Sequence, residues 1–168
     1  MNQVDTGSPS PWHIVQADTA EQIAVARELF LEYARSTSAD VCFQQFDGEV
    51  ATLPGRYAPP RGRLLLAFQQ DLAAGCVALR ELGDGICEMK RLYVRPAFRG
   101  QGGGGRLARR IIEEASEVGY QRMRLDTLAS MERAIVLYQS LGFVAIAPYC
   151  HNPDPSALFF ELRLGAAS

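Results

Sequence analysis

The sequence lacks the long apolar segments that mark membrane and secreted proteins. None of its 168 residues belongs to an apolar run near the roughly 20 residues that a membrane-spanning helix needs. Residues 1–11 are polar and rich in Ser, Pro and Gly, without the basic and then apolar pattern of a signal peptide. We therefore predict a flexible N-terminal leader over residues 1–11 on a cytoplasmic protein, with no membrane as partner.

Metal-ligating residues are also scarce. The four cysteines, Cys42, Cys76, Cys87 and Cys150, show neither a Cys-x-x-Cys pair nor a Cys/His metal spacing. No metal site is therefore expected. Cys76 and Cys87 lie in apolar stretches, where a reduced thiol behaves as a small hydrophobic residue.

The chain has little net charge. Its formal charge of −2 gives no overall reason to expect nucleic acid as a partner. The distribution is uneven, however, because seven basic residues and one acid lie between Glu88 and Arg110. A local basic patch on an acidic protein suits a compact polyanionic ligand better than a long polyanion.

Hydrophobic periodicity predicts an α/β chain with a mixed sheet and helices on both of its faces. A helix should follow Thr19, which has capping-box spacing to Gln22. A short helix is expected near residues 47–52, a third ends at Gly119, and a fourth is capped by Ser130. Strands are expected over residues 12–17, 64–69, 72–82, 86–94, 123–127, 143–147 and 157–164.

Residues 99–106 read Arg-Gly-Gln-Gly-Gly-Gly-Gly-Arg, between an expected strand and an expected helix. Backbone N–H groups at a helix N-terminus bind phosphate oxygens, and glycines let several of them converge because no side chain intrudes. The turn therefore predicts a phosphate site, with added charge from Arg99 or Arg106. A flexible linker is the alternative. Each glycine inside a helix lowers the stability of the helix by roughly 1 kcal/mol, so a run of glycines without a function is disfavoured.

Two well-known phosphate-binding patterns fit this turn poorly. A Walker loop needs Lys and then Ser or Thr after its last glycine, whereas Arg106 and Leu107 follow Gly105. The dinucleotide pattern Gly-x-Gly-x-x-Gly does match at Gly100, Gly102 and Gly105. A run of glycines matches this pattern easily by chance, and the turn lies too far from its strand for a Rossmann loop. A dinucleotide site stays the weaker alternative.

Two segments resemble motifs of the GNAT acetyltransferases. Glu-Met-Lys-Arg-Leu-Tyr-Val-Arg-Pro-Ala-Phe-Arg-Gly-Gln-Gly-Gly-Gly, residues 88–104, places Arg99, Gly102 and Gly104 at the family's Arg/Gln-x-x-Gly-x-Gly/Ala signature. Ile-Val-Leu-Tyr-Gln-Ser-Leu-Gly-Phe, residues 135–143, is similar to the family's Leu-Tyr-x-x-Leu-Gly-Phe segment. Many relatives carry Asn at the start of the helix before that segment, where this chain has Ser and Met.

The resemblance covers nearly the whole chain after residue 11. It implies a single GNAT domain over residues 12–168, with a central mixed, mostly antiparallel sheet of six to seven strands. Helices would cover both faces, and the two central parallel strands would splay apart at residues 92–94 and 125–128. The implied activity is transfer of the acetyl group of acetyl-CoA to a primary amine, by direct attack in a ternary complex.

The resemblance also implies a set of residues that bind acetyl-CoA. Backbone groups of Leu92 and Val94 would bond the pantetheine arm, and the pyrophosphate would lie on residues 101–105. The full predicted set is Leu92, Tyr93, Val94, Arg99, Gly100, Gln101, Gly102, Gly103, Gly104, Gly105, Arg106 and Ser130.

Glu88 and Tyr138 are the predicted catalytic residues. Relatives often carry a catalytic carboxylate where Glu88 stands, and a carboxylate partly withdrawn from water makes a better base. The alternative is that Glu88 pairs with Arg91 or Lys90 on the sheet. Tyr138 occupies the tyrosine of the second motif, from which relatives protonate the CoA sulfur. Its alternative is an ordinary core aromatic.

The acceptor is less well specified. His151 and Asn152, in the loop 148–156 that borders the acceptor pocket in this fold, are the predicted substrate contacts. A small-molecule amine is the favoured acceptor, while a protein N-terminus or lysine stays open, as does a homodimer. A GNAT-fold CoA-binding sensor or interaction module without catalysis is the alternative function, and the retention of Glu88 and Tyr138 disfavours it.

Overall fold

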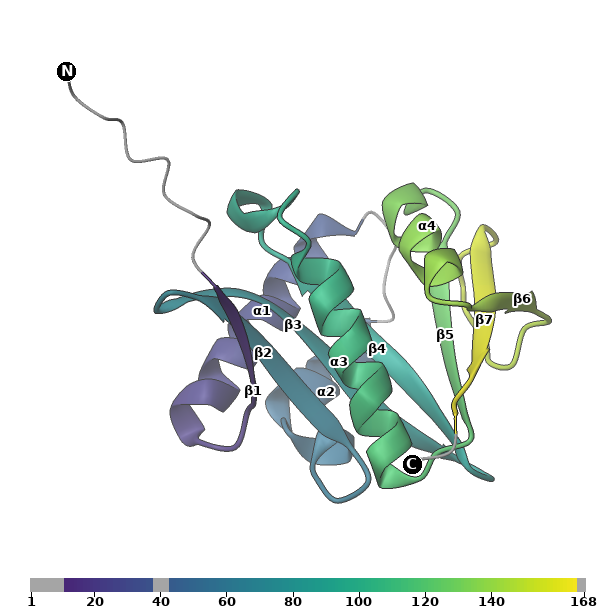
Figure 1. Ribbon diagram of the computed structural model, residues 1–168, viewed down its shortest axis with the longest axis horizontal. Helices are drawn as coiled ribbons and strands as arrows, with labels where there is room; N and C mark the ends of the chain where they lie inside the picture. Colours follow the sequence, from purple (N-terminus) through teal and green to yellow (C-terminus); the bar gives the residue numbers. More distant parts are fainter. Residues whose placement is uncertain (1–10, 38–42, 166–168) are drawn as a thin grey trace.

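The computed structural model describes residues 11–37 and 43–165, so the expected leader lies outside the described residues except at Pro11. In these ranges seven strands form one sheet in the order β1-β2-β3-β4-β5-β7-β6 (Figure 1). The strands are β1 (Trp12–Gln16), β2 (Arg63–Gln69), β3 (Leu72–Gly83), β4 (Ile86–Val94), β5 (Arg122–Leu128), β6 (Val144–Ile146) and β7 (Ala157–Arg163). Only β4 and β5 pair in parallel, which confirms the predicted mixed, mostly antiparallel sheet.

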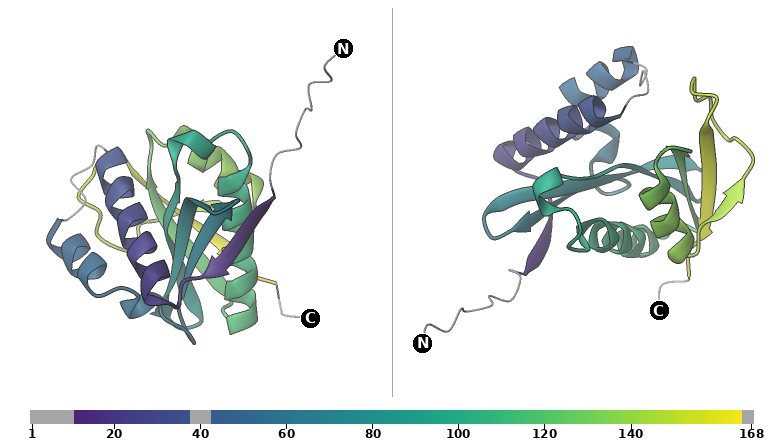
Figure 2. Two further views of the ribbon diagram at one scale, coloured as in Figure 1. Left: turned by 90° about the vertical axis from the view of Figure 1, so that its left-hand side faces the viewer. Right: turned by 90° about the horizontal axis from the view of Figure 1, so that it is seen from above.

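Helices cover both faces of the sheet, as predicted. Helices α1 (Ala20–Ser36) and α2 (Phe43–Ala51) lie on one face, and α3 (Gly103–Val118) and α4 (Glu132–Ser140) lie on the other (Figure 2). Two 3₁₀ turns, η1 (Gly55–Tyr57) and η2 (Pro96–Phe98), precede β2 and α3. The capping box of Thr19 and Gln22 is confirmed at the start of α1, whereas α2 begins earlier than the helix expected near residues 47–52.

Alternating side chains of the central strands build two hydrophobic cores. In β2, Leu65 packs toward α3, whereas Leu64 and Leu66 pack toward α1, as the period of two in a strand requires. Cys76 and Cys87 are free and fully buried, one in each core, which confirms their predicted packing role. Burial raises the pKa of the Cys87 thiol to about 12, so this thiol is neutral and unreactive near pH 7.

The start of α4 differs from the prediction. Met131, not Ser130, is the N-cap of this helix, and no side chain caps it. The cause is a turn in which the Met131 N–H donates to the Leu128 carbonyl at 2.9 Å, which leaves Ser130 outside the helix. Ser130 instead lines the cavity described next.

Candidate active site

The parallel strands β4 and β5 separate soon after they meet. They pair at only three positions, the last of which joins Glu88 to Arg124. Residues 89–94 of β4 then have no ladder with β5, although they still pair with β3 on their other side. This is the splay that the sequence predicted.

A cavity of about 730 Å³ crosses the sheet at this splay. Tyr33 and Ser36 of α1 line it on one face of the sheet, together with Thr37 after this helix. Glu132, Arg133, Ala134 and Leu137 of α4 line it on the other face. Residues of the two strands and of the segments that follow them complete its wall: Leu92, Tyr93, Val94, Phe98, Arg99, Gly100, Gly102, Gly103, Gly104, Leu128, Ser130 and Met131. One continuous space therefore joins the glycine turn to both faces of the sheet.

The glycine turn presents free backbone donors at the start of α3. Gly102 is the N-cap in a left-handed conformation, and no side chain caps this helix. The Arg106 N–H donates to the Gly102 carbonyl at 3.1 Å, which closes the first helical turn. The N–H groups of Gly103, Gly104 and Gly105 consequently have no partner within the helix, which is what a phosphate site requires.

Not every glycine of the turn is explained by a ligand. Gly100 and Gly102 have φ of 79° and 81°, which disfavours any side chain. A Cβ on Gly103 would lie 2.4 Å from the Trp12 ring, so packing requires glycine there. A Cβ on Gly104 would lie 3.9 Å from Val94 and Leu137 and would clash with nothing in the protein. The space beside Gly104 is therefore the part of the turn that packing within the protein leaves open.

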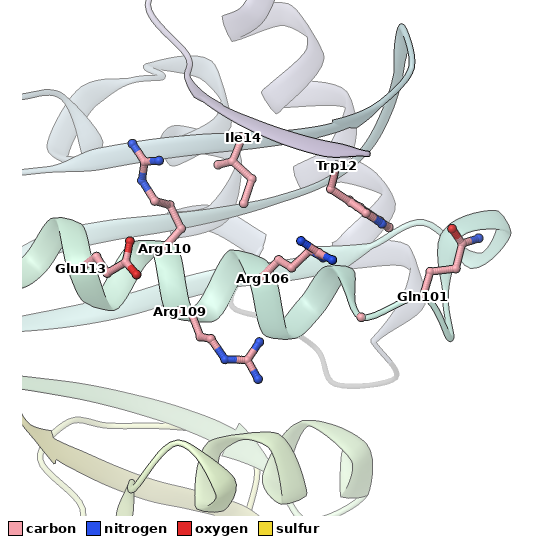
Figure 3. A pocket seen from close by; sticks show the side chains of 8 residues that line it. Trp12, Ile14, Gln101, Arg106, Arg109, Arg110 and Glu113 are labelled. Carbon is pink, nitrogen blue, oxygen red and sulfur yellow. The ribbon is translucent and has the colours of Figure 1, made fainter. Parts of the chain in front are cut away.

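Three predicted cofactor residues do not line this cavity. Gln101 and Arg106 line a second groove of about 530 Å³, between β1 and α3, where Arg106 and Arg110 extend toward β1 and Arg109 extends away from it (Figure 3). Gly105 lines neither space. A Cβ at this position would lie 3.0 Å from the Arg109 guanidinium. The resemblance assigned residues by motif position, which does not distinguish the two sides of the turn.

Much of the basic segment between Glu88 and Arg110 is neutralised in the fold. Lys90, Arg91, Arg95 and Arg110 form salt bridges with Asp126, Glu49, Glu32 and Glu114 respectively. Arg99 donates from Nε to the Val94 carbonyl at 3.1 Å, beside the cavity. The net charge available to a polyanion is therefore smaller than the sequence suggested.

Glu88 is almost completely buried, with 1% of its surface exposed. Its Oε1 accepts from Arg80 Nε at 2.7 Å and lies 3.9 Å from Lys90 Nζ. Its Oε2 accepts from the Tyr149 hydroxyl at 2.6 Å. The predicted alternative partner Arg91 is wrong, because Arg91 pairs with Glu49 at 2.9 Å, while Lys90 is confirmed as the more distant of two cations beside Glu88.

A second carboxylate lies beside the first. Asp126 of β5 forms a salt bridge with Lys90 at 3.4 Å and accepts from Asn152 Nδ2 at 2.9 Å. Burial by itself would raise the pKa of Asp126, but Lys90 and Asn152 outweigh it and lower that pKa below its usual value. The structure thus brings Asn152 to the site, while His151 is exposed on the same loop.

Tyr138 is buried in α4, where its ring meets Phe143 edge to face at 5.8 Å. Its hydroxyl forms no hydrogen bond with any described residue. Burial raises the pKa of Tyr138, and Tyr33 and Asp126 raise it further. Tyr138 does not itself line the cavity, but its neighbour Leu137 does. A neutral phenol can donate a proton.

The architecture and these residues match a known family of enzymes. The model of the acetyltransferase (GNAT) family matches residues 23–143. This chain belongs to the GNAT family of acetyltransferases. An uncharacterised N-acetyltransferase of Schizosaccharomyces pombe is 42% identical to it, over 81% of this chain and 85% of that protein. The YjgM N-acetyltransferase of Escherichia coli is 30% identical, over 85% and 86% of the two chains.

Solved GNAT structures share the fold. The yncA protein of Salmonella typhimurium, solved with its cofactor acetyl-CoA, superposes with a TM-score of 0.72 over 95% of this chain and 97% of that one, at 23% identity. The family match and the N-acetyltransferase relatives show that this GNAT protein is an acyltransferase. Within residues 11–37 and 43–165, no three His, Cys, Asp or Glu side chains are grouped to hold a metal ion. No helix of the described part has the length and apolar character to cross a membrane.

The identities and roles of the acid and base stay predictions, and Tyr138 permits a simple test. Tyr138→Phe keeps the ring against Phe143 and removes only the hydroxyl. We expect turnover to fall about 10–10³-fold, as for loss of one donor at a developing charge. The KM for acetyl-CoA should change little. Steady-state kinetics with free-thiol detection measures both quantities, and unchanged turnover would reduce Tyr138 to a packing residue.

Sequence reasoning missed three residues of this site, namely Arg80, Asp126 and Tyr149. Arg80 lies on β3 directly across the ladder from Glu88. Asp126 lies two positions after Arg124, the last residue of β5 that pairs with β4. Neither falls in a recognised motif. The register of the sheet, which the sequence does not state, brings them together.

Proposed function

We propose that this GNAT protein transfers the acetyl group of acetyl-CoA to the primary amine of a small molecule, by direct attack in a ternary complex. The cavity that crosses the sheet at the splay carries this proposal. It lets one ligand extend from the glycine turn to the splay while a second approaches from the α1 face. The two substrates can then meet without a covalent enzyme intermediate.

The residues along the cavity fit acetyl-CoA. The donors of Gly103 and Gly104 suit its pyrophosphate, and the free edge of β4 over Leu92–Val94 suits an extended arm that adds like a strand. When bound, acetyl-CoA supplies an activated acyl group with a thiolate as the leaving group. The protein's part is to hold the amine, accept its proton and donate one toward the sulfur, roles for which Glu88 and Tyr138 are the candidates.

The loop between β6 and β7 supports a small acceptor. Tyr149 and Asn152 fasten this loop to Glu88 and Asp126 on the α1 side of the sheet, which restricts the room left for a bulky substrate. The cations nearest the site are already paired, as in Arg80 with Glu88 and Lys90 with Asp126. We infer that shape and hydrogen bonding, rather than net charge, select the amine.

Release of free thiol from acetyl-CoA with a panel of acceptors tests this proposal. The panel holds amino acids, polyamines, aromatic amines, a lysine peptide and a peptide with a free N-terminus. We expect at least one small amine to raise thiol release about tenfold or more over the acceptor-free rate, with the acetylated product seen by mass spectrometry. CoA should also raise the melting temperature by binding only the folded state, and NAD should not.

Two outcomes would contradict the proposal in different ways. A clear preference for the peptides would replace the small amine by a protein acceptor. Stabilisation by CoA without thiol release for any acceptor would favour the alternative function, a CoA-binding module without catalysis.

A further inference from the structure

Tyr149 is hydrogen-bonded to the buried carboxylate of Glu88. Its hydroxyl donates to Glu88 Oε2 at 2.6 Å, while Arg80 Nε holds Oε1 at 2.7 Å. Each oxygen thus accepts one hydrogen bond, and only 1% of Glu88 is exposed. An incoming amine cannot reach this buried carboxylate directly unless a neighbouring side chain moves.

The ring of Tyr149 is held from two further strands. Phe159 of β7 meets it edge to face at 5.5 Å, and the Arg124 guanidinium of β5 lies 5.3 Å from its centroid. Arg124 is itself fixed by Glu161 at 2.8 Å. Tyr149 is only half buried, so it is the member of the Tyr149–Glu88 pair that a substrate can approach.

Burial and the neighbouring carboxylates keep the Tyr149 hydroxyl protonated. Burial is the main cause that raises the pKa of Tyr149, and the charges of Glu88 and Asp126 add to it. Arg80 and Lys90 neutralise Glu88 on its other side, and the Arg124 guanidinium contacts the ring. A neutral phenol can donate to Glu88 and accept a proton from the amine at the same oxygen.

We propose that Tyr149 is a catalytic residue that relays the acceptor's proton to Glu88. This inference rests on the proposed function. As the amine nitrogen bonds to the carbonyl carbon, its N–H bond breaks and that proton passes to Tyr149 Oη. The proton of Tyr149 passes to Glu88 Oε2, and the C–S bond breaks with its electron pair on sulfur. Glu88 later returns its proton through Tyr149 to water, and sulfur takes up one proton to leave as free thiol.

Tyr149→Phe tests the relay, because it keeps the packing against Phe159 and removes the hydroxyl. We expect turnover to fall about 10–10³-fold, within the range for a positioned proton-transfer group, with the KM for acetyl-CoA within about twofold of the parent. The matched control is Tyr120→Phe, which removes a hydroxyl that donates to the Arg61 carbonyl at 2.7 Å away from the site. The control should turn over like the parent. Parent-like turnover in Tyr149→Phe would overturn the relay.

A double variant separates one proton path from two. Tyr149 and Glu88 act in series in the relay, so Tyr149→Phe with Glu88→Gln should be no slower than the slower single variant. Multiplied losses would mean that the two residues act independently and would overturn the proposal.

A measurement without substrate distinguishes failure of the relay from failure of the proposed function. Removal of the Glu88 carboxylate changes the hydrogen bond that the Tyr149 hydroxyl donates, so the ultraviolet difference spectrum at neutral pH between the parent and Glu88→Gln should contain a tyrosine band. This band should be missing from the difference between Tyr149→Phe and the double variant. No tyrosine band in the first difference would overturn the pairing. A parent inactive with every amine, yet showing this difference, would contradict the proposed function and keep the pair.

Discussion

Glu88→Gln should lower turnover about 10²–10⁴-fold, the range for loss of a positioned acid or base. Glutamine keeps the size of the side chain: its amide oxygen can still accept from Arg80, and its NH2 group can donate to the Tyr149 oxygen, but it cannot take up the acceptor's proton. The affinity for CoA should change little, because Glu88 does not line the cavity that reaches the glycine turn. Steady-state kinetics checks the loss of turnover, and calorimetry checks separately that the affinity for CoA is unchanged.

The pH dependence of turnover tests the role of Glu88 independently. An acidic limb of the parent's profile that depends on the base should be absent from Glu88→Gln, which has no carboxylate at this position. Asp126 is the neighbouring carboxylate, and its lowered pKa keeps it ionised until the pH falls below its usual range. An acidic limb that persists in the variant would therefore come from another group.

Stability must be separated from chemistry in this test. Glu88→Gln leaves the charge of Arg80 without its partner, so the variant should also melt at a lower temperature. Glu114→Gln is the matched control, since Glu114 is likewise buried and pairs with Arg63 at 2.7 Å and Arg110 at 2.9 Å. The control should lose stability and keep its turnover. Equal loss of turnover in both variants would mean that unfolding, not catalysis, explains Glu88→Gln.

Local patterns in the sequence predicted the local structure well. The capping box of Thr19 and Gln22 depends on residues a few positions apart, and it is found in the structure. The Ser130 cap failed for a local reason too, since a turn that ends at Met131 competes for the same backbone. Helix ends commonly shift by one or two residues in this way.

The partners of Glu88 illustrate what the sequence could not provide. Arg80 meets Glu88 through the register of the β3–β4 hairpin, and Tyr149 reaches it from 61 positions further along the chain. The nearer candidate, Arg91, lies at a bulge with φ of 59°, where it meets Glu49 instead. Such contacts depend on strand order and on one irregular residue, neither of which periodicity encodes.

Gly104→Val should weaken CoA binding about 100-fold or more. The added side chain starts beside Val94 and Leu137 and extends into the cavity where the phosphates would approach the free N–H groups of α3. Loss of one or two hydrogen bonds to a charged group, at about 1.5–3 kcal/mol each, gives a loss of this order. Titration calorimetry with CoA measures it, and Gly48→Val, in an open position on α2, is the control that should bind like the parent.

Gly104→Ala makes the interpretation independent of folding defects. Alanine favours a helix over glycine by about 1 kcal/mol, and its methyl group finds room 3.9 Å from the nearest side chains. This variant should therefore melt at a higher temperature than the parent and keep its affinity for CoA within a few-fold, since the family signature admits alanine at this position. Gly104→Val should lose affinity for CoA without a matching loss of melting temperature, because obstruction of a phosphate site lowers the affinity alone, whereas damage to the fold lowers both. If Gly104→Val binds CoA as tightly as Gly104→Ala does, the phosphates do not lie beside Gly104.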